Sequence, residues 1–224
     1  MRWKTCGSIL LTIAAQVLAQ EKDSKLTPPF GTVVEVRITD TATGAPLPCR
    51  LTVVGSDGKL APIEAEKAPW IAARPGVVYT GTGEARFALK PGRYTLYANR
   101  GFEYGLVKRD LDVSREPVQL GLRLEREVDT TGYVSCDPHI HTLTYSRHGD
   151  STVEERMATI AGEGIELAIS TEHNHHADYA PFQEKTRTGS QFTSVLGNEV
   201  TTPAGHVNAF PIRPGSAVPE FRST

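Results

Sequence analysis

Apolar and polar residues alternate along the first half of the chain. Val34, Val36 and Ile38 share one face of an extended segment, and polar or charged residues separate them. Glycine and proline interrupt the pattern at short intervals, and no helical period replaces it. Such spacing predicts a small antiparallel β-sandwich over residues 31–127. Further strands are expected at residues 49–53, 77–80, 85–89, 94–98 and 118–124.

The pattern changes after residue 132, where strand-like and helix-like stretches alternate. Residues 152–162 carry apolar side chains at helical spacing, and Ser151 and Glu154 are spaced like a capping box. Apolar segments suited to strands occur at residues 133–137, 165–170, 192–196 and 206–212. This alternation predicts a parallel α/β arrangement in residues 132–224, with chemistry at the C-terminal ends of the strands.

The first 19 residues have the features of an export signal. Arg2 and Lys4 precede an apolar run at residues 9–15, and Ala19 is a small residue suited to cleavage. The apolar run is shorter than the roughly 20 residues that span a bilayer. We therefore expect a signal peptide over residues 1–19, a linker over 20–30, and a secreted or periplasmic protein without a membrane segment after cleavage.

Composition excludes few classes of function. Hydrophobic residues make up 39% of the chain and charged residues 22%, which is ordinary for a globular protein. A net charge of −2 without a basic run argues against a nucleic-acid partner. Signal cleavage would leave Cys49 and Cys136, which fall in different expected domains. Two free, buried cysteines are therefore favoured over a disulfide.

All seven histidines lie between residues 139 and 206. Alternate residues of a strand share a face, so His139 and His141 are expected to point the same way. Imidazole and carboxylate groups bind zinc, manganese or iron, and carboxylates can bridge two ions. The pattern therefore predicts a multinuclear metal site. Its candidate residues stand at the ends of the expected strands: Asp137, His139, His141, Glu172, His173, Glu199 and His206.

These motifs resemble a known family. The segments 137–142, 149–150 and 170–174 are similar to the first motifs of the polymerase and histidinol phosphatase (PHP) family, and 197–199 and 205–208 to its third and fourth. The resemblance implies a distorted (β/α)₇ barrel that holds two or three divalent ions (Zn, Mn or Fe). Residues 31–127 resemble the carboxypeptidase-regulatory-like sandwiches that precede this domain in secreted members.

The resemblance also implies roles for individual residues. Glu199 would bridge two ions, and Asp137 would bind metal or orient a histidine from the second coordination sphere. His148 competes with Asp150 for one ligand position, because the spacing departs from the usual form. The implied metal ligands are His139, His141, Asp150, His173, Glu199 and His206. The implied catalytic residues are Asp137, Glu199 and His173.

The predicted function is metal-dependent hydrolysis of a small-molecule phosphate ester, by metal-bound hydroxide. One alternative is hydrolysis of carbamates, amides or carboxylic esters at the same site. Another is a catalytically incomplete fragment whose sandwich is a binding or spacer module. The stretch after Tyr133 is much shorter than the roughly 200–250 residues of a full barrel. We therefore expect an incomplete barrel in a chain truncated at its C-terminus.

Overall fold

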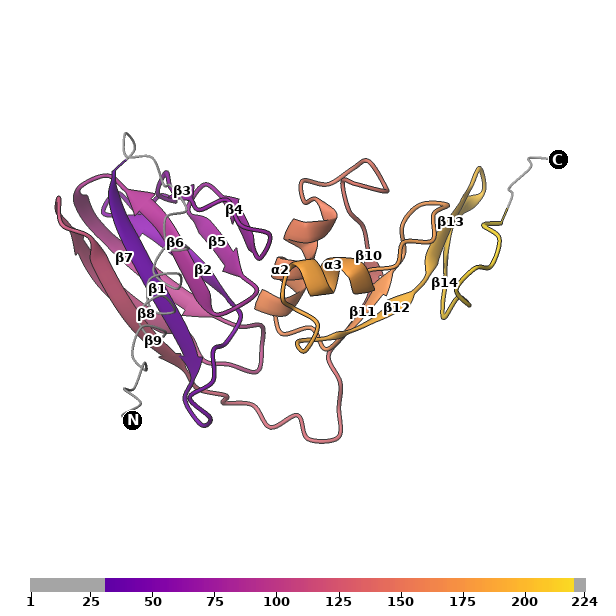
Figure 1. Cartoon of the computed structure of the whole chain (residues 1–224), viewed down its shortest axis with the longest axis horizontal. Helices are drawn as coiled ribbons and strands as arrows, with labels where there is room; N and C mark the ends of the chain where they lie inside the picture. Colours follow the sequence, from indigo (N-terminus) through magenta and orange to yellow (C-terminus); the bar gives the residue numbers. More distant parts are fainter. Residues whose placement is uncertain (1–30, 220–224) are drawn as a thin grey trace, which may run out of the picture.

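The computed structural model describes residues 31–219, which form two lobes (Figure 1). The sandwich lobe comprises residues 32–124, and the C-terminal lobe comprises residues 136–209. The predicted signal peptide and linker lie outside the described residues. Among the described residues, no helix combines the length and the apolar character needed to cross a membrane.

Two sheets face each other in the sandwich lobe. The first has the strand order β3 (Glu64–Ala65), β6 (Glu84–Leu89), β1 (Thr32–Asp40) and β9 (Val118–Leu124). The second has the order β4 (Ile71–Arg74), β5 (Val77–Thr80), β2 (Cys49–Gly55), β7 (Gly92–Asn99) and β8 (Val107–Val113). Neighbouring strands are antiparallel except β1 and β9, which run parallel.

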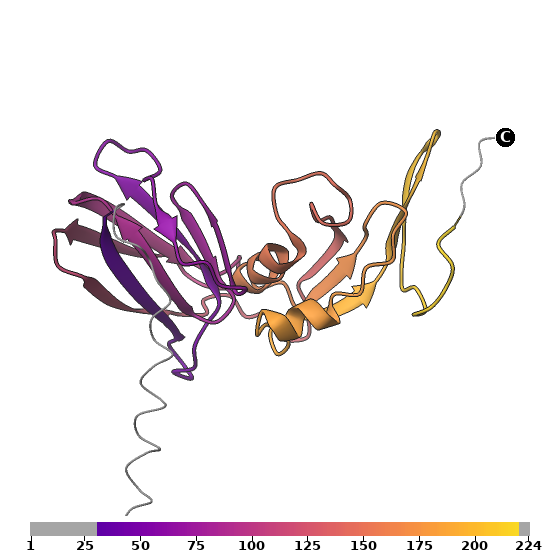
Figure 2. The same cartoon turned by 45° about the horizontal axis from the view of Figure 1, so that its top comes forward.

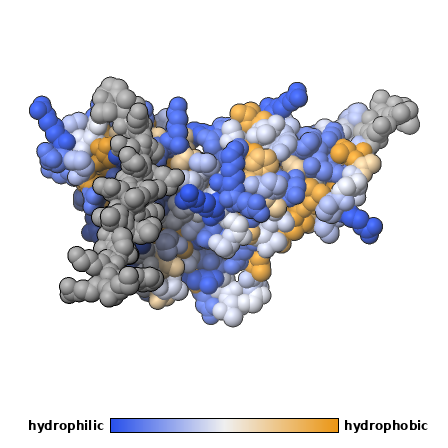
Figure 3. Space-filling view, in the orientation of Figure 1, coloured by the Kyte–Doolittle hydropathy of each residue, from blue (hydrophilic) through white to orange (hydrophobic). Residues whose placement is uncertain are grey.

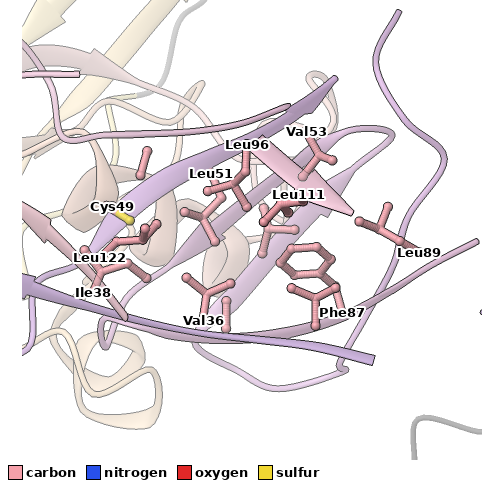
Figure 4. Packing of buried hydrophobic residues seen from close by; sticks show 14 of the residues in the cluster. Val36, Ile38, Cys49, Leu51, Val53, Phe87, Leu89, Leu96, Leu111 and Leu122 are labelled. Carbon is pink, nitrogen blue, oxygen red and sulfur yellow. The ribbon is translucent and has the colours of Figure 1, made fainter. Parts of the chain in front are cut away.

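The apolar alternation of the sequence builds the core between these sheets. Val34 and Ile38 of β1 are fully buried, and they belong to one cluster with Leu51, Phe87 and Leu96 from other strands. Figure 4 shows Ile38 in this cluster with Leu51, Phe87 and Leu96. Burying each such side chain contributes roughly 1.5–3 kcal/mol. The residues between them turn outward, so the two-residue period decides which face of each strand is covered.

The C-terminal lobe contains a parallel sheet, two helices and a separate hairpin. The sheet has the order β10 (Cys136–Ile140), β11 (Leu167–Ser170) and β12 (Thr193–Leu196). The helices are α2 (Val153–Gly162) and α3 (Ala180–Lys185). The strands β13 (Asn198–Thr202) and β14 (Gly205–Ala209) form the hairpin, which stands at the end of the lobe farthest from the sandwich (Figure 2).

The prediction of a sandwich followed by an incomplete (β/α)₇ barrel is wrong in its second part. Within residues 31–219 the parallel sheet stops at three strands and forms no barrel. The segment expected as a fourth strand pairs antiparallel with β13 instead. Gly205 has a φ of 135°, which only glycine adopts readily, so the chain reverses at this point. The described fold is mainly β-structure with two short helices.

Helix α2 begins one residue later than the sequence predicts. Thr152 accepts a hydrogen bond from the backbone of Glu155, whose carboxylate accepts one from the backbone of Thr152. This reciprocal capping box replaces the expected pair Ser151 and Glu154. Met157 and Ile160 of the helix are buried and face the lobe's own core.

The two cysteines differ in their surroundings. Cys49 is free and buried in the sandwich core, and burial raises the pKa of its thiol to about 12. Cys136 is free but exposed, so the expectation that it is buried is wrong. It lies on β10, which is an edge strand of the small sheet, and an edge strand leaves side chains open to solvent.

Polar contacts join the lobes along β4, β5 and α2. Arg74 of β4 forms ion pairs with Asp150 at 3.0 Å and with Glu155 at 2.9 Å. The buried Arg100 donates hydrogen bonds to the carbonyl oxygens of Pro48 and Ala161, one in each lobe. These contacts hold α2 against the sandwich. Figure 3 shows hydrophobic residues at several places on one face of the C-terminal lobe. Val207 is one of the exposed hydrophobic residues of this lobe.

Candidate metal centre

Five histidines and one glutamate converge in the C-terminal lobe. This histidine cluster consists of His139, His141, His148, His173, Glu199 and His206, whose ligand atoms form three overlapping groups. The strands β10 and β11 end beside each other, because Ile140 lies in register with Ser170. His141 and His173 therefore follow neighbouring strand ends. The parallel sheet brings together residues that are far apart in the sequence.

Backbone hydrogen bonds hold the hairpin over these strand ends. The amide of Glu199 donates to the carbonyl of Glu172 at 3.1 Å, and the amide of Asn174 donates to the carbonyl of Glu199 at 3.1 Å. Between them, His173 and Glu199 form an isolated parallel bridge. The side chain of Asn174 also accepts a hydrogen bond from Thr201 at 3.0 Å. These hydrogen bonds hold the start of β13 beside the segment that follows β11, and they place Glu199 next to the histidines.

Glu199 is the centre of the cluster. It is 4% exposed, and four imidazole rings surround its carboxylate. Its Oε2 lies 2.8 Å from His141 Nε2, 3.2 Å from His173 Nδ1 and 3.3 Å from His139 Nε2. Its other oxygen, Oε1, lies 2.8 Å from His206 Nδ1. A single buried carboxylate therefore has nitrogen atoms from four histidines within contact distance.

The spacing of these atoms suits a transition metal. Zinc binds imidazole at about 2.0–2.1 Å in tetrahedral geometry, which separates two ligand nitrogens by roughly 3.3 Å. The Nε2 atoms of His139 and His141 are 2.9 Å apart, close to that value. The separations around Glu199 fall in the same range.

His148 belongs to the cluster, whereas Asp150 does not. The His148 ring centroid lies 4.8 Å from that of His141 and 4.9 Å from that of His173. Asp150 turns away to form its ion pair with Arg74, which lowers the pKa of its carboxyl group. Of the two alternatives left open by the sequence, the structure brings only His148 to the other histidines.

Burial lowers the pKa values of His141 and His173, and the neighbouring histidines add to this effect while Glu199 opposes it. For Glu199 itself, burial opposes ionisation, but hydrogen bonds from His139 and His206 outweigh it and lower the pKa. The site therefore favours an ionised Glu199 beside neutral rings at His141 and His173. Those are the protonation states that metal ions bind.

The remaining acidic residues and histidines of this region take different places. Asp137 accepts a hydrogen bond from the amide of His139 at 3.1 Å and lines a cavity between the lobes, outside the cluster. His175 stacks on Tyr145, and His176 contacts the carbonyl of Ser216. Glu172 is fully buried and forms hydrogen bonds to hydroxyl groups and one amide, not to the histidines.

Sequence reasoning missed the hydroxyl groups that contact the histidines. Ser146 Oγ lies 3.0 Å from His141 Nδ1, and Thr201 Oγ1 lies 2.6 Å from His173 Nδ1. Serine and threonine are common in loops and strands, and neither residue stands in a distinctive motif. Thr201 follows Glu199 by two residues on the same strand, so strand alternation is the one signal that could have placed it near the cluster.

No protein-family model and no curated protein matches this chain. Similar solved structures include BcpA, the major pilin subunit of Bacillus cereus, with 16% identity and a TM-score of 0.32. The group B streptococcus pilus 2b backbone protein has 14% identity and a TM-score of 0.31. The shaft pilin SpaA from Lactobacillus rhamnosus GG has 12% identity and a TM-score of 0.33. The matches cover 43–44% of this chain and 31%, 41% and 48% of those proteins.

The predicted membership of the PHP family is therefore wrong. No family model matches the chain, and the described residues form no (β/α)₇ barrel. The predictions of a phosphoesterase, of an enzyme, and of a small-molecule ester as the partner rested on that resemblance, and they are corrected with it. Among the described residues, Asp137 is in none of the ligand groups that contain His173 and Glu199.

Proposed function

We propose that this chain is a non-enzymatic metal-binding module in which a β-sandwich serves as the spacer for a histidine-rich metal centre. The observation that carries the proposal is the buried Glu199 carboxylate, which has four imidazole nitrogens within 3.3 Å. An ionised carboxylate among neutral ring nitrogens is a donor set in the protonation states that a divalent cation binds.

The donor set favours a borderline metal such as zinc. Imidazole suits zinc, copper, iron and nickel, whereas an all-oxygen site would suit magnesium or calcium. The three overlapping groups together contain six ligand residues, and the two oxygens of Glu199 can bind one ion each, which supports at least two ions. In this arrangement Glu199 would bridge neighbouring ions, and His139, His148 and His206 would complete their coordination.

The spacer role rests on the sandwich lobe. Its interior is a continuous apolar cluster, and none of the ligand groups found among the described residues lies in it. The lobe therefore offers a rigid body to which α2 is fastened by ion pairs and buried hydrogen bonds. Such a body would keep the metal centre at a fixed distance from whatever precedes it.

The place of action that we propose is outside the cytoplasm, either secreted or periplasmic. The support is the pattern of the first 19 residues, with basic residues ahead of an apolar run and alanine at the expected cleavage position. A mass spectrum of the exported protein tests this. The expected mature chain begins at Gln20, and a chain that begins at Met1 contradicts it.

Zinc binding tests the central proposal. The full chain is stripped with a chelator, and Zn²⁺ stoichiometry and affinity are measured by native mass spectrometry and calorimetry. We expect two or more ions for the wild-type chain. Glu199→Gln should lower the affinity by more than about 100-fold, because loss of a direct ligand exceeds the 10–100-fold effect of an outer partner. It keeps the size of the side chain and removes the charge.

Glu184→Gln is the matched control. Glu184 is exposed on α3 and the same substitution there removes the same charge, so Zn²⁺ binding should stay at the wild-type level. Equal weakening by both variants would mean that the ions are held by general surface charge. No binding by the wild-type chain would reject the metal-binding module.

A further inference from the structure

Four side chains share the face of the β13–β14 hairpin that carries metal ligands. In the antiparallel register Glu199 lies opposite Asn208, and Thr201 lies opposite His206. Alternate residues of a strand share a face, and residues directly opposite each other share it as well. Glu199 and His206 belong to the histidine cluster. Thr201 Oγ1 lies 2.6 Å from His173 Nδ1. Asn208 is therefore the fourth side chain on a face whose other three members all contact the cluster.

The register places Asn208 beside the central carboxylate. The backbone amide and carbonyl of Glu199 form hydrogen bonds to Glu172 and Asn174, on the side of β13 that faces away from β14. Glu199 and Asn208 thus form a non-hydrogen-bonded pair. In such pairs the Cα atoms are typically about 4.5 Å apart, and the side chains are closer than in hydrogen-bonded pairs. The side chain of Asn208 is therefore a direct neighbour of the Glu199 carboxylate.

The side-chain oxygen of Asn208 is buried and has no hydrogen-bond partner in the part of the chain that the structure describes. The residue as a whole is only half-buried, so this oxygen faces the protein and not the solvent. Burying an amide oxygen without a partner is costly, and most such atoms in native proteins have one. Asn198 also has buried amide atoms without partners, but it precedes Glu199 by one residue and lies on the opposite face of β13.

The ligand group nearest to Asn208 contains three residues, which are His173, Glu199 and His206. Structural zinc sites are almost always four-coordinate, whereas catalytic sites have three protein ligands and an open position. The oxygen of an asparagine side chain is an established ligand of divalent cations. It has no proton to lose and adds no charge to the site. The unpaired oxygen of Asn208 thus has the chemistry that this group lacks.

We propose that Asn208 is a further ligand of the metal centre and binds through its side-chain oxygen. The ion is the one that His173, Glu199 and His206 bind. This inference rests on the proposed function, because it concerns the same metal centre. It also deepens that function, since a fourth protein ligand closes the coordination sphere. A closed sphere is typical of sites that hold a metal and do not catalyse a reaction.

The plainer alternative is that Asn208 is an ordinary polar residue of the hairpin, with a solvent molecule as the partner of its oxygen. Asn208→Leu separates the two, because leucine has a similar size and no oxygen. Asn208→Asp keeps an oxygen at the same position and serves as the rescue variant. Asn99→Leu is the matched control, since Asn99 is also partly buried but lies on β7 in the sandwich lobe.

The first readout is the side-chain ¹³Cγ and NH₂ resonances of the full wild-type chain, followed while the metal-free protein is titrated with Zn²⁺. Coordination through the oxygen polarises the amide carbonyl. The Asn208 resonances should therefore shift in step with the zinc that is bound, and those of Asn99 should stay in place. Unchanged Asn208 resonances in a chain that binds zinc would overturn this inference and leave the proposed function standing.

The second readout compares Zn²⁺ affinity with the stability of the metal-free protein. Asn208→Leu should weaken binding at least about 10-fold, the lower end of the effect of losing an outer partner. Asn208→Asp should bind at least as tightly as the wild type, and Asn99→Leu should match it. Without metal, Asn208→Leu should melt at the wild-type temperature or above, because it removes an unpaired buried oxygen.

Two outcomes of the second readout contradict the inference. If Asn208→Leu is less stable without metal as well as weaker in binding, Asn208 has a structural role and the inference is overturned. Wild-type affinity in Asn208→Leu overturns it too, while the proposed function stands. A wild-type chain that binds no zinc rejects the proposed function and this inference together.

Discussion

The two lobes bury different kinds of side chain. The sandwich lobe encloses aliphatic and aromatic residues from both of its sheets, such as Val34, Leu51 and Phe87. The C-terminal lobe has a smaller apolar cluster around Met157, and most of the polar residues that are buried in the described chain belong to this lobe. They include Thr142, Ser170, Thr171, Glu172, Gln183, Asn198 and Glu199.

The two interiors make different contributions. The apolar interior stabilises the fold, and the polar interior supplies groups that can bind a ligand. Apolar burial is favourable without any particular partner, so the sandwich is stable through many interchangeable contacts. Burying a polar group is costly unless it is hydrogen-bonded, so the C-terminal lobe depends on specific hydrogen bonds such as those of Glu172. A cation-binding site needs oriented polar groups, so it is expected in the polar interior of the C-terminal lobe. We expect perturbations of the two lobes to have separable effects.

Leu51→Ala is the largest expected perturbation. Leu51 is completely buried between the sheets, and its truncation leaves a cavity (Figure 4). Urea denaturation should show a loss of about 2–5 kcal/mol in the free energy of unfolding. Zn²⁺ affinity of the folded protein should not change. Lys108→Ala, at an exposed position of β8, is the control and should cost well under 1 kcal/mol. A matching fall in Zn²⁺ affinity would contradict the separation of the lobes.

Zinc should stabilise the C-terminal lobe selectively. A ligand that binds only the folded state adds about 2.7 kcal/mol when its concentration is 100 times the dissociation constant. Hydrogen exchange should therefore slow at the amides of β11, β13 and β14, which carry or adjoin the ligands. Amides of β1 and β2 should be unaffected. Uniform slowing in both lobes would indicate that zinc acts elsewhere, and Glu199→Gln should abolish the selective effect.

Acid should weaken the C-terminal lobe in the absence of metal. The pKa values of His141 and His173 lie below their ordinary value of 6.5, so the unfolded chain binds more protons than the folded one in that range. Stability is then fully present above pH 6.5 and falls as the pH drops toward the lowered values. Glu199, with a pKa below 4.5, adds a loss at lower pH.

The sandwich lobe supplies the internal control for this effect, because no histidine precedes residue 139. Hydrogen exchange at pH 7.5 and 5.5, corrected for intrinsic rates, should show faster opening of β11 at the lower pH and little change in β1. His173→Asn should reduce the difference. An equal change in both lobes would contradict the assignment to the cluster.

Arg74→Ala is the smallest expected perturbation, and it addresses the contact between the lobes. Arg74 pairs with Asp150 and Glu155, but its side chain is 37% exposed. Partly exposed ion pairs contribute about 0–1 kcal/mol, and salt screens them. We expect a loss in that range, which decreases in 1 M NaCl. A loss above about 2 kcal/mol would show that the interface, and not each lobe alone, carries the stability.

Sequence patterns predicted the local elements more accurately than their assembly. The alternation of Val34, Val36 and Ile38 indicated a strand with one buried face, and helix α2 was expected within a residue of where it begins. The strand β8 was missed, because its charged residues hide the period. The short helix α3 was missed as well, since six residues are too few to establish a helical pattern.

The candidate site was partly predictable from the sequence. Histidines and a glutamate at strand ends were expected to converge, and the structure brings together His139, His141, His173, Glu199 and His206. The choice between His148 and Asp150 was beyond the sequence, because it depends on Arg74 in the other lobe. The resemblance to a hydrolase family failed for a related reason: short motifs specify residues, but not the sheet that carries them.

By itself, the sequence determined which segments are extended, which residues lie on the covered faces, and which side chains can bind a cation. These properties follow from side-chain chemistry and from the two-residue period of a strand. Tertiary structure decided the rest: that Glu199 lies among four imidazoles, that β14 folds back on β13, and that Ser146 connects Glu172 with His141. Such contacts join residues distant in the sequence, so only the folded chain can specify them.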